Sequence, residues 1–102
     1  MAVDTKRIPA EALQTFTRDV FIGFGLKRSE AEQVAEVLVA SDVQGIDSHG
    51  VPRMKMYTDR LRDGLVNVDP VMTVITETPA TLALDADNGM GHPASIEAMN
   101  RC

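Results

Sequence analysis

The chain has 102 residues, of which 15 are acidic and 10 are lysine or arginine, so its net charge is −5, and 44% of the residues are hydrophobic. These proportions are typical of one soluble globular domain and exclude a collagen-like or disordered chain. No apolar run reaches the roughly 18 residues that cross a bilayer, so no membrane partner is expected. The acidic balance argues against nucleic-acid binding through phosphate neutralisation.

The ends of the chain bear on its compartment. The N-terminal residues MAVDTKRIPAEAL lack the apolar segment and cleavage site of a secretory signal. Cys102 is the single cysteine and cannot form an internal disulfide, which fits a reducing compartment. We therefore expect a cytoplasmic protein.

A first helix is predicted over residues 9–24. Pro9 suits its first turn, and Gly25 suits the left-handed position that follows a helix. The residues expected to face the core recur at helical spacing and are Leu13, Phe16, Val20 and Phe24.

A second helix is predicted from Ser29 to about Gln44. Ser29 and Glu32 have the spacing of a capping box, in which each side chain binds a backbone N–H of the first turn. The apolar face of this helix is expected to consist of Ala31, Val34, Ala35 and Leu38.

A third helix is predicted over residues 50–63, with Pro52 in its first turn and Gly64 at its end. Its expected apolar face consists of Met54, Tyr57, Leu61 and Leu65.

After Pro70 the pattern changes to that of strands. Residues 71–76 are rich in β-branched side chains, and residues 81–84 form a second short apolar run. Asn88-Gly89 predicts a turn, and residues 93–101 predict the start of a fourth helix with Ile96 and Met99 on its apolar side. The predicted fold class is therefore α+β: three helices, a β-hairpin and the start of a fourth helix. Because two strands do not make a stable sheet, this looks like the beginning of a larger fold.

Chemically useful side chains concentrate between the second and third helices. His49, Arg53 and Tyr57 would share one side of a helix that begins near His49, with Ser48 beside them. A histidine exchanges protons near neutral pH, and a guanidinium grips a carboxylate through two hydrogen bonds. This set suits reduction of an α-keto acid, with Arg53 holding the carboxylate and His49 protonating the oxygen. From spacing alone, simple helix capping by Asp47 or Ser48 and solvated side chains at His49, Arg53 and Tyr57 are the favoured interpretations.

Residues 89–94, GMGHPA, formally fit the phosphate-binding pattern G-x-G-x-x-A. An ordinary turn followed by a helix start is the favoured interpretation, because the confirming strand–helix–strand context is missing. Cysteine and histidine nowhere show metal-ligand spacing, so no metal site is expected.

The sequence of residues 41–53, SDVQGIDSHGVPR, resembles the malate/L-lactate dehydrogenase family. This is the non-Rossmann group that includes ureidoglycolate and sulfolactate dehydrogenases and diketogulonate reductase. The resemblance continues through Tyr57, Arg60-Leu61, Gly64, residues 78–92 and the helix start at Glu97-Ala98-Met99.

This resemblance implies an NAD- or NADP-dependent oxidoreductase that interconverts a 2-hydroxy acid and a 2-keto acid. By position, His49 would be the proton donor or acceptor beside Ser48, Arg53 would bind the substrate carboxylate, and Tyr57 would line the pocket. Residues 1–68 would be an N-terminal helical subdomain, and residues 69–102 would begin the catalytic domain. Family members are homodimers or larger and about three times longer. The cofactor-binding residues are therefore unknown here, and the chain is expected to be inactive by itself.

Two other interpretations stay open. The chain could be a carrier module modified on Ser48, because a small acidic chain with a serine at a helix start loosely resembles an acyl carrier. It could instead be a non-catalytic protein that pairs with a longer subunit through the edge of its hairpin.

Overall fold

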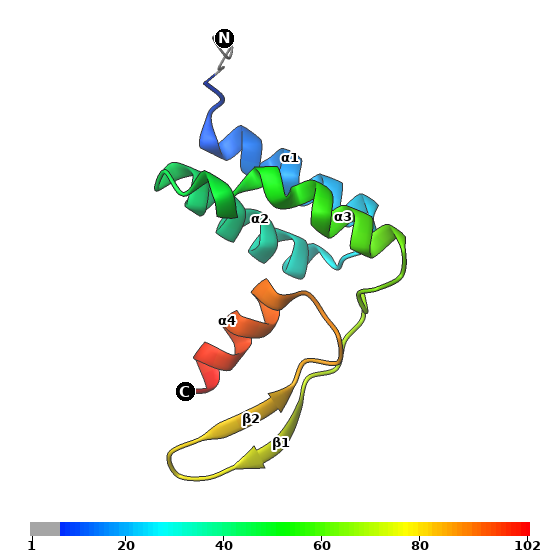
Figure 1. The fold of residues 1–102 in the computed structure, drawn as a ribbon, viewed down its shortest axis with the longest axis vertical. Helices are drawn as coiled ribbons and strands as arrows, with labels where there is room; N and C mark the ends of the chain where they lie inside the picture. The colour runs from blue at the N-terminus through cyan, green and yellow to red at the C-terminus, as the bar shows by residue number, and fades with distance from the viewer. Residues whose placement is uncertain (1–6) are drawn as a thin grey trace.

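The computed structural model describes residues 7–102 and has dimensions of 54 × 29 × 24 Å. Helices α1 (Ala10–Gly23), α2 (Arg28–Val43) and α3 (Met54–Arg62) form one lobe, with α4 (Gly91–Arg101) beside α2 and the hairpin at the far end (Figure 1). Two 3₁₀ turns, η1 (Asp47–His49) and η2 (Val51–Arg53), join α2 to α3. The hairpin consists of β1 (Thr73–Glu77) and β2 (Leu82–Asp85). The predicted α+β class is confirmed.

The core lies between α1, α2 and α3. The buried face predicted for α2 is confirmed, and the core also takes in Phe21, Leu26, Leu61 and Met90. The apolar stripe predicted for α1 was partly wrong, because Phe16 is 58% exposed and Phe24 is 40% exposed. Thr17 and Phe21, one helical turn apart, are fully buried instead. A polar residue thus occupies a core position that apolar spacing assigned to its neighbour.

The start of α2 differs from the predicted capping box. The helix begins at Arg28, and its N-cap residue Lys27 makes no side-chain capping bond. Glu32 accepts a hydrogen bond from Nε of Arg28 at 3.1 Å instead of bonding back to Ser29. Lys27 pairs with Asp69 at 2.6 Å, which ties the start of α2 to the segment before the hairpin.

Residues after α3 are tied to the turn that follows β2. Asp87 and Asn88 have φ angles of 54° and 58°, and the N–H of Gly89 donates to the Ala86 carbonyl at 3.0 Å, so this is a type I′ turn. The Asn67 N–H donates to the Asn88 carbonyl at 2.9 Å. The turn predicted at Asn88-Gly89 is confirmed with its centre one residue earlier, and these bonds fix the base of the hairpin.

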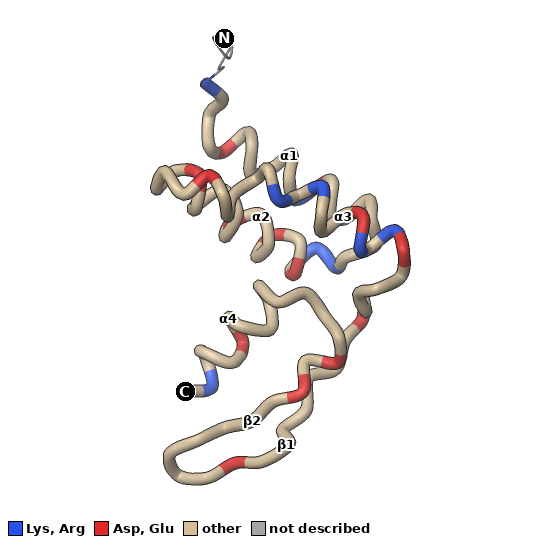
Figure 2. Tube along the Cα trace, viewed as in Figure 1, with Lys and Arg blue, Asp and Glu red and all other residues tan. Residues whose placement is uncertain are grey.

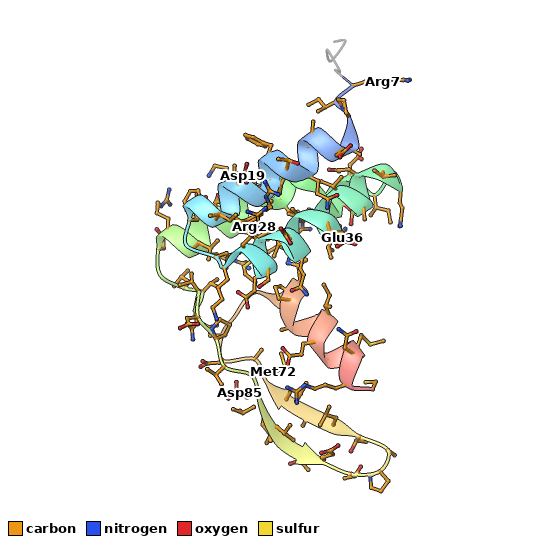
Figure 3. The ribbon with its side chains drawn as sticks, turned by 180° about the vertical axis from the view of Figure 1, so that it is seen from behind. Arg7, Asp19, Arg28, Glu36, Met72 and Asp85 are labelled. Atoms are coloured by element: carbon orange, nitrogen blue, oxygen red, sulfur yellow. The ribbon has the colours of Figure 1, made fainter. Side chains whose placement is uncertain are left out.

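The hairpin projects away from the lobe formed by α1, α2 and α3, and α4 lies between that lobe and the hairpin (Figures 1 and 3). Its strands are antiparallel, with Thr73 opposite Asp85 and Glu77 opposite Leu82, and every residue of β1 is exposed. The strand starts two residues later than predicted, because the N–H of Val71 donates to the Asp87 carboxylate at 3.1 Å rather than to a neighbouring strand. The chain carries no lysine or arginine between Asp63 and Asn100, so positive charge lies on the helices and near the termini (Figure 2).

Candidate active site

The segment between α2 and α3 carries three of the four predicted site residues. Gly45, with φ of 80°, ends α2, and the N–H of Ile46 donates to the Ser41 carbonyl at 2.8 Å. The chain then forms η1, passes through extended Gly50 and forms η2 before α3 begins. Ser48, His49 and Arg53 are all exposed on this segment.

Ser48 and His49 are in direct contact. The Ser48 hydroxyl oxygen lies 2.8 Å from Nδ1 of His49. The ring is thereby held on one side by a hydroxyl, and Nε2 is left as the nitrogen that can face a ligand. Where Nδ1 carries its hydrogen and donates to the Ser48 hydroxyl oxygen, Nε2 is bare in the neutral ring and protonated in the imidazolium, so it can accept or give a proton.

Arg53 folds back onto the same segment. Its Nε donates to the backbone carbonyl of Ser48 at 2.6 Å. This bond joins η2 to η1 and fixes the plane of the guanidinium group. The two terminal nitrogens, Nη1 and Nη2, keep the paired geometry that matches the two oxygens of a carboxylate.

The predicted helical arrangement of these residues was wrong in its backbone. A helix was expected from residue 50, but α3 starts at Met54, and the extended conformation of Gly50 separates His49 from the helix. His49 and Arg53 each contact Ser48, His49 through the hydroxyl and Arg53 through the backbone carbonyl. Ser48, His49 and Arg53 are therefore joined by contacts, but through two short turns and not through the predicted helix face.

Tyr57 lies one turn into α3, half-buried, and its ring packs against a residue that was predicted only as a helix start. The Tyr57 and His92 ring centroids are 5.1 Å apart, and the ring planes are inclined by 81°. Nδ1 of His92 is buried with no hydrogen-bond partner among the described residues. Burial lowers the pKa of His92 below its ordinary value of 6.5.

The GMGHPA stretch forms a turn and a helix start, as favoured from the sequence. Gly91 is the first residue of α4, and Met90 before it is buried in the core. Gly89 lies against Pro70, since a Cβ on it would come within 2.8 Å of the Pro70 ring. Gly89 is thus packed against Pro70, whereas nothing lies within 4 Å of the Cβ position of Gly91.

A cavity of about 450 Å³ lies between the start of α2 and α4. Its polar lining includes Lys27, Glu30 and Asn100, and four residues of the GMGHPA stretch also line it: Gly89, Met90, Pro93 and Ala94. Ser48, His49, Arg53 and Tyr57 do not line it. Burial raises the pKa of Glu30, which accords with its partly enclosed position at this cavity. The cavity holds no group that adds to the chemistry of the Ser48–Arg53 segment.

Within residues 7–102, the acidic, histidine and cysteine side chains form no group of three that could hold a metal ion. In the same residues, each helix is too short or too polar to cross a membrane.

Sequence reasoning assigned no supporting role to Asp42, Gly50 or His92, which contact the candidate site residues or the backbone between them. Asp42 accepts the Val51 N–H, and Gly50 is buried against Asp42. Both lie inside the 41–53 string, but their contact depends on how two short turns fold back on α2. His92 is one of only two histidines in the chain, which was the available signal, and its contact with Tyr57 spans 35 residues.

Known proteins resemble this chain over nearly its whole length. A family model described as Malate/L-lactate dehydrogenase matches residues 8–102. The malate dehydrogenase of Pyrococcus abyssi is 38% identical over 93 residues, which cover 91% of this chain and 26% of that protein. The ureidoglycolate dehydrogenase (NAD(+)) of Escherichia coli K12 is 37% identical over 93 residues, which cover 91% of this chain and 27% of that protein.

Solved structures agree with the sequence matches. The malate dehydrogenase of Pyrococcus horikoshii OT3 superposes with a TM-score of 0.91 at 35% identity, over 98% of this chain and 29% of that one. The delta1-piperideine-2-carboxylate reductase of Pseudomonas syringae pvar. tomato superposes with a TM-score of 0.84 at 28% identity, over 95% and 29%. The chain spans about a quarter of the length of the curated relatives it matches. With residues 8–102 matched by its model, the chain belongs to the malate/L-lactate dehydrogenase family.

Proposed function

We propose that this chain is the substrate-side part of an NAD- or NADP-dependent oxidoreductase that interconverts a 2-hydroxy acid and a 2-keto acid. The single observation that carries the proposal is the contact set of Ser48, His49 and Arg53. A proton-exchanging ring and a carboxylate-binding fork are joined through Ser48, by its hydroxyl and by its backbone carbonyl. Family membership supports the reaction class.

Each residue has a defined role in the reaction. Arg53 binds the substrate carboxylate through Nη1 and Nη2, while its Nε stays on the Ser48 carbonyl. As imidazolium, with Nδ1–H on the Ser48 hydroxyl oxygen, His49 gives the Nε2 proton to the substrate oxygen during reduction and is left neutral, and neutral Nε2 takes the proton back during oxidation. Ser48 orients the His49 ring through Nδ1. Tyr57 is proposed to line the substrate pocket from its match to the family pattern, and its observed contact is with the His92 ring.

The cofactor is assigned to no residue of this chain. A bound nicotinamide would supply or accept hydride, and the turn and helix start at residues 89–94 are assigned no role in holding it. Residues 1–68 are proposed as a helical subdomain and residues 69–102 as the start of the catalytic domain, in a cytoplasmic protein. The 102-residue chain alone is expected to be inactive.

The partner proposal is a second copy of the complete enzyme, giving a homodimer or larger assembly. The exposed β1 edge is the observation that favours pairing, because it carries none of the lysines that discourage strand addition. Light scattering on the complete gene product that contains this sequence tests this, and a monomer at micromolar concentration contradicts it.

The function is tested by assaying that complete gene product with NADH and NADPH against a panel of 2-keto acids and cyclic imino acids. We expect cofactor oxidation with at least one of them and none from residues 1–102 alone. A carrier function is the alternative, since Ser48 is exposed. Incubation with a phosphopantetheinyl transferase and coenzyme A, followed by intact-mass analysis, would show a mass gain on Ser48 only in that case.

A further inference from the structure

We propose that Asp42 is the positioning residue for the site, holding the Ser48–Arg53 segment against the end of α2. This inference rests on the proposed function. Oδ2 of the partly buried Asp42 side chain accepts the backbone N–H of Val51 at 2.9 Å. Val51 lies two residues after His49 and two before Arg53, so this one bond fixes the backbone between the proton-exchanging ring and the carboxylate-binding fork.

Gly50 makes the Asp42 contact possible. It is buried, and a Cβ built on it would overlap the Asp42 carboxylate, with Oδ1, Cγ and Oδ2 all too near for a real contact. Its φ of −98° and ψ of −153° are open to any residue. Glycine is therefore required here by the close approach of the carboxylate and not by backbone conformation.

The position of Asp42 argues against a role in stabilising α2. A carboxylate one residue from the C-terminal end of a helix faces the negative end of the helix dipole, which disfavours it. Residues 29–50 contain no lysine or arginine. Among the described residues Asp42 forms no salt bridge, and the backbone N–H of Val51 is its side chain's hydrogen-bond partner.

Among the described residues, no other hydrogen bond joins η2 to α2. The N–H groups of His49, Gly50 and Arg53 donate to carbonyls only three residues earlier, which shapes each turn locally. The bond from Asp42 instead crosses nine residues and sets where η2 lies relative to α2. The Ile46 N–H to Ser41 carbonyl bond holds the start of the segment on α2, so loss of the Asp42 bond frees η2, which carries Arg53, while each turn keeps its shape.

The experiment compares Asp42→Ala, Asp42→Asn and the control Asp63→Ala in the complete gene product. Asp63 is also an aspartate at a helix end, but it pairs with Arg62 on the surface. Hydrogen exchange read by mass spectrometry follows the Val51 amide, and steady-state kinetics and nucleotide titration follow the site. In Asp42→Ala we expect Val51 to exchange about tenfold faster or more and kcat/KM for the keto acid to fall about tenfold or more, with nucleotide affinity unchanged.

Asp42→Asn should restore both quantities to within about threefold of the unmodified protein, because its amide oxygen still accepts the Val51 N–H. Asp63→Ala should change neither. Unchanged Val51 exchange in Asp42→Ala overturns the proposal, and so does faster exchange with kcat/KM within twofold of the original. A parallel loss of nucleotide binding and melting temperature also overturns it, since it marks general unfolding. Absence of turnover in the unmodified protein removes the proposed function instead, and the exchange result alone then decides whether Asp42 anchors the segment.

Discussion

The ring of Tyr57 in α3 meets the ring of His92 in α4 almost perpendicularly, with centroids 5.1 Å apart. Edge-to-face pairs of this kind stabilise a protein beyond the apolar area that they bury. The contact joins the helical lobe to the part of the chain that follows the hairpin. It therefore connects a residue of the proposed substrate pocket to an element far away in the sequence.

A double-mutant cycle with Tyr57→Ala and His92→Ala should reveal this contact. We expect a coupling free energy of about 0.5–1.5 kcal/mol, the usual range for an aromatic pair. Urea unfolding of the complete gene product and its three variants measures the coupling. Strict additivity of the two losses would show that the rings do not interact in solution.

The burial of His92 predicts how stability depends on pH. Its pKa in the folded protein lies below the ordinary value of 6.5, so the unfolded chain binds the proton more readily. The contribution of neutral, buried His92 to the free energy of unfolding is therefore fully present above pH 6.5 and is lost as the pH falls through and below that value. The difference in unfolding free energy between the original protein and His92→Gln should shrink on acidification. A difference that is constant from pH 8 to pH 5 contradicts this.

Gly50 and Gly23 should respond oppositely to the same substitution. Gly50→Ala places a methyl group on the Asp42 carboxylate, and we expect a loss of about 1–3 kcal/mol of stability, as for other overpacked sites. Gly23→Ala is the matched control, because nothing lies within 4 Å of its Cβ position at the end of α1. It should be neutral or stabilise by up to about 1 kcal/mol. Equal effects at both positions in thermal melts would argue against the close approach at Gly50.

Arg53 should control substrate affinity more than rate. Arg53→Ala removes a charge-assisted pair of hydrogen bonds, and we expect KM for the keto acid to rise about 10- to 100-fold. Arg53→Lys keeps the positive charge but loses the two paired nitrogens, so its KM should lie between those of the unmodified protein and Arg53→Ala. Arg62→Ala serves as control, since Arg62 pairs with Asp59 and Asp63 on the surface. An unchanged KM in Arg53→Ala removes Arg53 from the substrate site.

Much of this fold follows from local sequence patterns. The buried face of α2, the helix end at Gly25 and the turn near Asn88-Gly89 were predicted because each depends on residues close together in the sequence. Thr17 escaped prediction because apolar spacing does not identify a polar residue that is buried by its neighbours.

In the candidate site too, features set by neighbouring residues were predicted, and contacts between distant residues were not. Ser48, His49 and Arg53 were found because they are adjacent in a chemically dense string, yet the turns that join them were predicted as a helix. Asp42 holds Val51 across nine residues, and His92 meets Tyr57 across 35. Such contacts depend on the folded path of the backbone, and spacing rules carry no information about it.

The most direct test of the proposed function is the turnover of His49→Ala in the complete gene product. Keto-acid reduction and nucleotide binding are measured side by side with the unmodified protein. If His49 transfers the proton, kcat falls about 10²- to 10⁴-fold while the nucleotide dissociation constant stays the same. A kcat within twofold of the unmodified enzyme would contradict the assignment of His49 as the proton donor and acceptor.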